Sequence, residues 1–297
     1  MTPTLVRHHP AHAGPEPHTE PVPRADEQAR ARDWAEIQER MLVPLYEAVH
    51  ERLGVGPGTR LLGLGCGSGL ALLMAAARGA PVTGVDCDAP ERLALARERL
   101  TPETPAPPAP PGTRAPRART DARLLDALPT DGTAYDVVTA FDPVTCHGDD
   151  GPAGPLTAAV PLAAPGAPFV LTGWGPPERC ATASVLRVAA KLADPLHGWR
   201  PARRDDLEEV ARKAGLVPDG SGRVACPFGY ADVDNAVRGL LSTGLFDAAA
   251  AATDHKQVDK ELTEALHPYR RPDGTVWMPN VFRYLIARVP QRRQRVP

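Results

Sequence analysis

A run of closely spaced glycines is the feature of this sequence best suited to ligand chemistry. The segment Leu61–Gly69 reads LLGLGCGSG. Glycine has no Cβ, so a ligand can approach the backbone closely where a strand gives way to a helix. The GxGxG spacing of Gly65, Gly67 and Gly69 does not fit the GxGxxG loop of dinucleotide-binding folds, and the lysine of a phosphate-binding P-loop is missing. The loop therefore predicts close contact with a ligand of another kind.

An acidic residue, Asp86, stands 21 residues after Gly65, at the end of the next expected strand. A carboxylate in that place can accept hydrogen bonds from both hydroxyls of a ribose. Taken singly, the glycines could serve tight packing and the acid could cap a helix. Together, in a strand–loop–helix–strand setting, they predict a nucleoside-binding site.

The glycine loop lies within a repeating pattern of strands and helices. Apolar residues at steps of three or four from Trp34 to Leu53 predict helical structure from Ala25, with Pro44 beginning a second helix after a break. Further on, strands are expected at 60–64, 81–86, 135–141 and 168–174, with helices over 70–78 and up to Leu100, and a short or irregular one before the last strand. This alternation predicts an α/β fold in which helices cover both faces of a mostly parallel sheet.

The remainder of the chain predicts helices that cover the sheet rather than a second core. Helices are expected at 181–192, 204–213, 233–242 and 246–266, followed by a β-rich run at 276–289. Prolines number 35 of 297 and concentrate in 1–24 and 101–119, which we interpret as a disordered tail and an exposed inserted loop. We therefore expect one domain over 25–290 and a basic tail at 291–297.

Composition excludes several classes of function. The net charge of −2 gives no electrostatic reason to expect nucleic acid or an anionic membrane as a partner. Five cysteines without CxxC spacing indicate neither a disulfide framework nor a zinc site, and are interpreted as buried small residues. No metal site is predicted, and the N-terminus has no apolar signal region, so the expected location is the cytoplasm. The oligomeric state is not readable from the sequence.

With these residues in place, the chain resembles bacterial class I S-adenosylmethionine-dependent methyltransferases of the branch that acts on small molecules. The similar segments are RDWAEIQERMLVPLYEAV, VGPGTRLLGLGCGSG, VTGVD, YDVVTAF, GWGPPERC and FRYLIAR, within residues 29–289. The resemblance implies a Rossmann-like, seven-stranded, mostly parallel sheet whose last strand is antiparallel. It also implies S-adenosylmethionine over the carboxyl ends of the first two strands, and a helical cover over 227–270 that roofs the substrate pocket.

The resemblance implies cofactor contacts from three parts of the chain. The loop would pass under the methionine portion, the end of the second strand would hold the ribose and flank the adenine, and the end of the fourth strand would border the transferred methyl group. The implied residues are Gly65, Cys66, Gly67 and Gly69 in the loop, Asp86 and Cys87 after the second strand, and Phe141 and Asp142 after the fourth.

Two positions depart from the family pattern. Gly63 stands where the family normally has an acid that supports the methionyl end of the cofactor. Leu124 stands where an acid usually contacts the adenine amino group, unless Asp121 or Asp126 takes that part. Both departures weaken the expected binding of cofactor.

Methyl transfer is an in-line displacement in which the cofactor brings the reactivity and the protein brings alignment, so a general base is optional. His147, near the predicted active edge, is the candidate base, with a solvated loop histidine as the plainer interpretation. His255 and His267 are more simply helix-surface residues. Five aromatic residues could line an acceptor pocket or pack in the core: Trp34, Phe228, Tyr230, Phe246 and Trp277.

Three functions follow from this pattern. The leading prediction is a methyltransferase acting on a small-molecule acceptor. The alternative is a degenerate, non-catalytic protein of the same fold that serves as a ligand-binding or partner-binding scaffold. A nicotinamide-dependent oxidoreductase is a third class, against which the glycine spacing argues.

Overall fold

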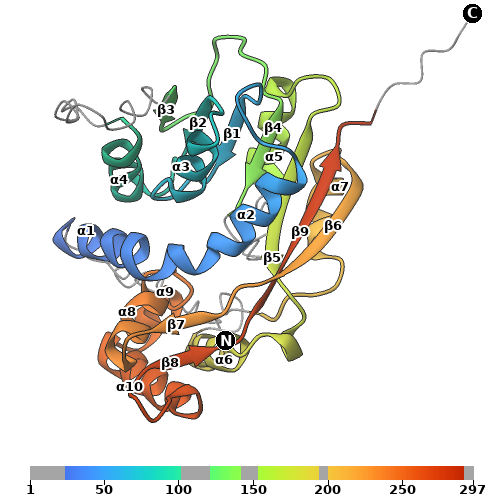
Figure 1. Cartoon of the computed structure of the whole chain (residues 1–297). Helices are drawn as coiled ribbons and strands as arrows, with labels where there is room; N and C mark the ends of the chain where they lie inside the picture. The colour runs from blue at the N-terminus through green and yellow to red at the C-terminus, as the bar shows by residue number, and fades with distance from the viewer. Residues whose placement is uncertain (1–23, 102–120, 142–152, 194–199, 291–297) are drawn as a thin grey trace, which may run out of the picture.

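Seven strands form one sheet in the order β3-β2-β1-β4-β5-β9-β6 in the computed structural model, which describes residues 24–101, 121–141, 153–193 and 200–290 (Figure 1). Strands β3 to β5 in that order run parallel, and β9 is antiparallel to both of its neighbours. The predicted sheet and its antiparallel last strand are confirmed. The strands are β1 (Leu61–Leu64), β2 (Val82–Val85), β3 (Ala122–Leu125), β4 (Val137–Ala140), β5 (Pro168–Trp174), β6 (Val217–Ala225) and β9 (Val281–Arg288).

Apolar residues on both faces of the central strands create two layers of core. On β5, Phe169 and Leu171 pack with the helices α5 (Ala153–Ala159) and α7 (Asp206–Lys213), whereas Val170 between them faces the opposite layer. This alternation follows from the two-residue period of a strand. Helices consequently cover both faces of the sheet, as the sequence pattern predicted.

The N-terminal helical segment changes its winding along its length. Helix α1 (Arg24–Asp33) passes into a π-helical turn (Trp34–Gln38), a 3-10 turn (Glu39–Leu42) and then α2 (Val43–Arg52). Pro44 lies in the first turn of α2, as predicted, but the expected break is absent because the helical path continues through the two intervening turns. Figure 1 shows α1 between α4 (Pro90–Leu100) and α8 (Val233–Leu241).

The helical cover contains more elements than the sequence pattern predicted. The expected helix at 246–266 is divided into α9 (Asp247–Ala252) and α10 (His255–Leu266), because the Asp254 carboxylate accepts a hydrogen bond from the backbone N–H of Gln257 and begins a new helix. Helix α6 (Thr182–Leu192) packs against both. Two short strands that were not predicted as a pair, β7 (Phe228–Tyr230) and β8 (Val276–Met278), form a separate antiparallel sheet.

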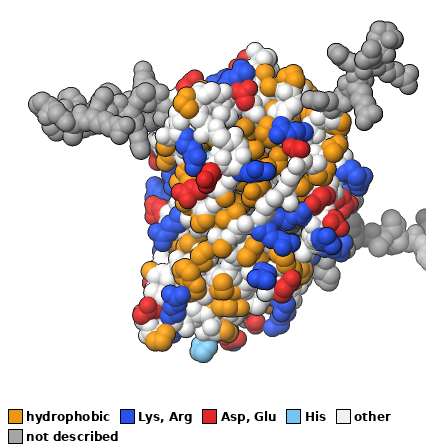
Figure 2. All heavy atoms as spheres, turned by 45° about the vertical axis from the view of Figure 1, so that its right-hand side comes forward, with side chains coloured by type: hydrophobic (Ala, Val, Ile, Leu, Met, Phe, Trp, Pro, Cys, Tyr) orange, Lys and Arg blue, Asp and Glu red, His pale blue; other side chains and the backbone are white. Residues whose placement is uncertain are grey.

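Several predictions fall on residues outside the described ranges: the tail at 1–23, nearly all of the inserted loop, the end at 291–297, Asp142 and the candidate base His147. Among the described residues, no helix combines the length and apolarity needed to cross a bilayer. On the face drawn in Figure 2, acidic and basic side chains are intermixed, with hydrophobic side chains visible between them.

Candidate ligand-binding site at the glycine loop

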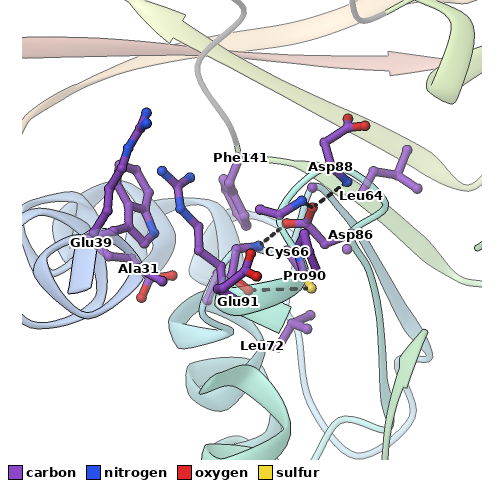
Figure 3. Close-up of a pocket in the computed structure, with 18 of the residues that line it drawn as sticks. Ala31, Glu39, Leu64, Cys66, Leu72, Asp86, Asp88, Pro90, Glu91 and Phe141 are labelled. Atoms are coloured by element: carbon purple, nitrogen blue, oxygen red, sulfur yellow. Dashed lines mark hydrogen bonds between the residues drawn. The ribbon is translucent and has the colours of Figure 1, made fainter. Parts of the chain in front are cut away.

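A cavity of about 500 Å³ lies at the carboxyl ends of β1 and β2. Its walls come from the glycine loop, the start of α4, the N-terminal helical segment and the end of β4. Figure 3 shows Asp86 and Cys66 on one side of this cavity, with Glu39 and Ala31 on the helical segment across from them. The volume falls in the range of small-molecule and cofactor sites.

The loop after β1 takes a backbone shape that favours glycine. Gly65, Gly67 and Gly69 have φ angles of 57°, 55° and 81°, in the left-handed region. Gly65 and Gly67 line the cavity, whereas Gly69 does not. A Cβ on Gly69 would lie 2.9 Å from the Cβ of Ala96, so this third glycine allows α3 (Leu70–Ala77) to begin directly beside α4. Two of the three predicted glycines therefore face the cavity and the third serves packing.

Asp86 joins the loop to the start of α4. Its Oδ2 accepts a hydrogen bond from the Gly67 N–H at 2.9 Å, and its Oδ1 accepts from the N–H groups of Ala89 at 3.0 Å and Asp88 at 3.3 Å. The residue is buried, which raises the pKa of its carboxyl, while these backbone hydrogen bonds oppose that shift. The carboxylate also lines the cavity, so the side chain that orders the turn before α4 also faces the site predicted for the ligand.

A second buried acid, Glu39, reaches the loop from the N-terminal helical segment and was not predicted. Its Oε2 accepts hydrogen bonds from the Ser68 hydroxyl and from Arg99 Nη1, the latter at 2.9 Å, and its Oε1 accepts from the Leu70 N–H at 3.3 Å. Burial raises the pKa of the Glu39 carboxyl. No regular helical period placed this residue on the apolar stripe, so the sequence pattern carried no signal for it.

Phe141, predicted to border the transferred methyl group, lies at the end of β4 and lines the cavity. The Tyr46 ring packs against it at 4.8 Å between centroids, and the fully buried His50 ring, one turn further along α2, lies 5.9 Å from it. Burial lowers the pKa of His50 to about 4, so its imidazole is neutral at pH 7. Neither His50 nitrogen has a hydrogen-bond partner within the described part of the chain.

The remaining predicted residues take varied positions. Cys66 lines the cavity, and burial raises the pKa of its thiol to about 12, whereas Cys87 is exposed and lies outside the lining, contrary to the expectation of buried cysteines. Of the five aromatic candidates, Trp34 lines the cavity, and Trp277 is exposed beside Arg271. The other three lie in the core: Phe228, Tyr230 and Phe246.

Both departures from the family pattern have a structural counterpart. A Cβ on Gly63 would lie 2.9 Å from Leu72 Cδ2, so Leu72 holds the space that a side chain there would need. Leu124 pairs with Gly84 inside the sheet, and the possible substitutes Asp121 and Asp126 are exposed and outside the cavity lining. The acid expected on β1 is therefore absent, and its room is filled.

Comparison with solved structures supports the fold. A protein of Bacillus halodurans C-125, provisionally assigned as a methyltransferase, matches 83% of this chain and 99% of its own at 14% identity and a TM-score of 0.51. The YcgJ protein of Bacillus subtilis matches 83% and 98% at 14% identity and the same score. The geranyl diphosphate C-methyltransferase of Streptomyces coelicolor A3(2), solved with S-adenosyl-L-homocysteine, matches 83% and 75% at 16% identity and a TM-score of 0.45.

No family model and no curated protein matches the sequence. At these identities the structural matches establish the fold alone. The chain has the Rossmann-like fold of class I S-adenosylmethionine-dependent methyltransferases, and the predicted resemblance is confirmed at that level.

Proposed function

We propose that this chain binds S-adenosylmethionine in the cavity and transfers its methyl group to a small-molecule acceptor. One observation carries the proposal: the buried Asp86 carboxylate stands at the end of β2, accepts a hydrogen bond from the glycine loop and lines a cavity of about 500 Å³. A ribose diol suits an acceptor carboxylate, and the bare glycine backbone suits a ligand that lies directly against it.

The cofactor, when bound, supplies an electrophilic methyl group on a sulfonium centre. The residues of this chain bind and orient the reactants: Asp86 holds the ribose and the glycine loop lies against the methionine portion, while Phe141 and Tyr46 form an apolar wall. Such a wall excludes water and positions an acceptor for in-line attack, which is the main protein contribution that methyl transfer requires.

A non-catalytic scaffold is the second candidate. Leu72 fills the space above Gly63, and Asp86 already accepts three backbone hydrogen bonds, as expected of a site that keeps its architecture after losing its reaction. The two candidates differ in whether bound cofactor is turned over.

Calorimetric titration of S-adenosylmethionine and S-adenosylhomocysteine into the full chain tests the proposal. We expect micromolar binding that Asp86→Ala abolishes. Asp136→Ala is the matched control, since Asp136 lies at the opposite, amino end of β4 and, among the described residues, its carboxylate accepts hydrogen bonds only from Arg60. Absence of binding by the unmodified chain at millimolar ligand would contradict the proposal.

Turnover then separates the two candidates. A panel of phenols, amines and carboxylic acids is incubated with S-adenosylmethionine labelled at its methyl group. Transfer of the label to any acceptor by the unmodified chain, together with loss of that transfer in Asp86→Ala, supports the enzyme. Tight cofactor binding without transfer to any member of a broad panel favours the scaffold.

A further inference from the structure

The π-helical turn at Trp34–Gln38 brings two side chains to one face of the N-terminal segment. The backbone N–H of Glu39 donates to the carbonyl oxygen of Trp34, five residues earlier. In a regular α-helix, residues five apart point in different directions, whereas the wider π turn aligns them. Trp34 and Glu39 therefore act from the same side of the cavity.

Both side chains converge on the glycine loop. A Cβ built on Gly67 would lie 3.4 Å from Trp34 Nε1 and 3.7 Å from Glu39 Oε1. Both residues line the cavity, and a glycine at position 67 keeps the space between them free of a side chain. A ligand in this part of the cavity would lie close to both side chains.

The Trp34 indole N–H is a buried donor that lacks an acceptor. The residue is 8% exposed, and its Nε1 has no hydrogen-bond partner in the ranges that the structure describes. Burying such a donor unpaired costs about 1–3 kcal/mol, so an acceptor from a ligand would recover that cost. The Arg92 guanidinium lies 4.4 Å from the centre of the Trp34 ring, and its positive charge favours an anionic acceptor at this end of the cavity.

Glu39 offers the complementary charge. Arg99 and Ser68 donate hydrogen bonds to its Oε2, while Oε1 accepts one long hydrogen bond from the described residues, that of the Leu70 N–H at 3.3 Å. A carboxylate oxygen has room for two acceptor contacts, so Oε1 retains capacity for a cationic donor. The segment thus presents a hydrogen-bond donor beside one carboxylate, a pairing that matches a zwitterionic amino acid.

We propose that Trp34 and Glu39 bind the amino-acid end of the cofactor, with Trp34 Nε1 donating to its carboxylate and Glu39 accepting from its ammonium group. This inference rests on the proposed function. Glu39 then takes the place of the acid that Gly63 and Leu72 exclude from β1. In this assignment the acid comes from the N-terminal helical segment, on the opposite wall of the cavity, instead of from β1.

Two ligands that share an adenosine group and differ in the amino-acid end test the proposed contact with Trp34 and Glu39. S-adenosylhomocysteine carries the amino-acid end, and 5′-methylthioadenosine has the same adenosine and thioether without it. We expect Trp34→Phe and Glu39→Gln each to weaken S-adenosylhomocysteine binding by about tenfold or more, as loss of a buried, charge-assisted hydrogen bond predicts. Binding of 5′-methylthioadenosine should change by less than about twofold in both variants, within the scatter typical of neutral contacts.

Trp174→Phe is the matched control. Trp174 also buries an indole N–H without a partner among the described residues, but it lies at the end of β5 and does not line the cavity. Its substitution should leave the affinity for both ligands unchanged. Thermal unfolding establishes that each variant is folded, and if one of the two site variants fails to fold, the other decides the question.

The outcomes separate this inference from the proposed function. If the unmodified chain binds neither ligand, both fall. If it binds S-adenosylhomocysteine and the site variants bind it equally well, the proposed function stands and this inference is wrong. If the variants weaken both ligands by the same factor, Trp34 and Glu39 act on the nucleoside side or on the fold, and the assignment to the amino-acid end is overturned.

Discussion

The carboxyl ends of β1 and β5 lie on the same edge of one sheet, yet the chain uses them differently. After β1, glycines and buried carboxylates surround a cavity. After β5, the Trp174 ring packs against Phe282 at 4.6 Å and Phe228 at 5.8 Å between centroids, and the rings occupy the space. The sheet edge is therefore only a place where sites can form, and the residues that follow each strand decide whether it opens or closes.

The largest effect is expected among the packed aromatic rings after β5. Phe282 is fully buried, so Phe282→Ala should lower the free energy of unfolding by about 3–5 kcal/mol. Affinity for S-adenosylhomocysteine should be unchanged because Phe282 does not line the cavity. Urea denaturation and calorimetry measure the two quantities. A loss of affinity in a variant that remains folded would show that the aromatic rings after β5 and the cavity after β1 are not independent.

The next effect concerns His50 behind the wall of the cavity. Its pKa is about 4 in the folded chain and 6.5 in the unfolded chain, so the unfolded chain takes up the proton first as pH falls. The stabilising contribution is complete above pH 6.5 and is lost towards pH 4, by about 3 kcal/mol.

Urea denaturation of the unmodified chain and of His50→Leu at pH 7 and pH 4 isolates this contribution. The variant should lose less stability on acidification. Equal losses in both proteins would show that His50 does not titrate as its burial implies.

A smaller effect is expected in the glycine loop. Gly69→Ala places a Cβ 3.2 Å from the backbone Cα of Ala96 at a positive φ, and should cost about 2–3 kcal/mol. Gly132→Ala is the control, because Gly132 has a similar φ of 74° but no atom within 4 Å of the added Cβ. Gly132→Ala should lower the free energy of unfolding by about 1 kcal/mol and leave ligand affinity unchanged, whereas Gly69→Ala should weaken ligand binding. Equal costs would mean that packing against α4 is unimportant.

The smallest effect is expected at the mouth of the cavity. The ion pair between Arg30 and Asp247 joins α1 to α9 at 2.7 Å, but its side chains are 39% and 58% exposed. Arg30→Gln should therefore change the unfolding free energy by less than about 1 kcal/mol, and less still in high salt. A larger change would indicate that this contact holds the cover against the N-terminal segment.

Local patterns predicted the strands better where the residues themselves favour a strand. The limits of β5 were predicted at Pro168 and Trp174, because its apolar residues suit a strand buried on both faces. Strand β6 was missed, because VPDGSGRVA is typical of a turn. Its partner makes it a strand: Gly222 lies under the ring of Tyr284 on β9, so the aromatic residue supplies the packing that the glycine lacks.

The same distinction applies to the candidate site. The glycine loop and Asp86 were predictable because their spacing lies within one strand–loop–helix–strand unit. Glu39 was not, because its position depends on a π turn that no periodicity in the sequence indicates. Trp34 was predicted only as one of five aromatic candidates, and its contact with Gly67 depends on packing between segments far apart in the chain.

The π turn also has a thermodynamic consequence. If Trp34 and Glu39 hold one end of the ligand, ligand binding and docking of the segment before β1 are linked equilibria. Helix α1 contributes no strand to the sheet and is largely exposed, so we expect it to open at a lower free energy than global unfolding requires. Added ligand should then slow amide hydrogen exchange across α1 and the π turn more than in β5 or β9. Bound ligand would thus stabilise the docked position of the first helix.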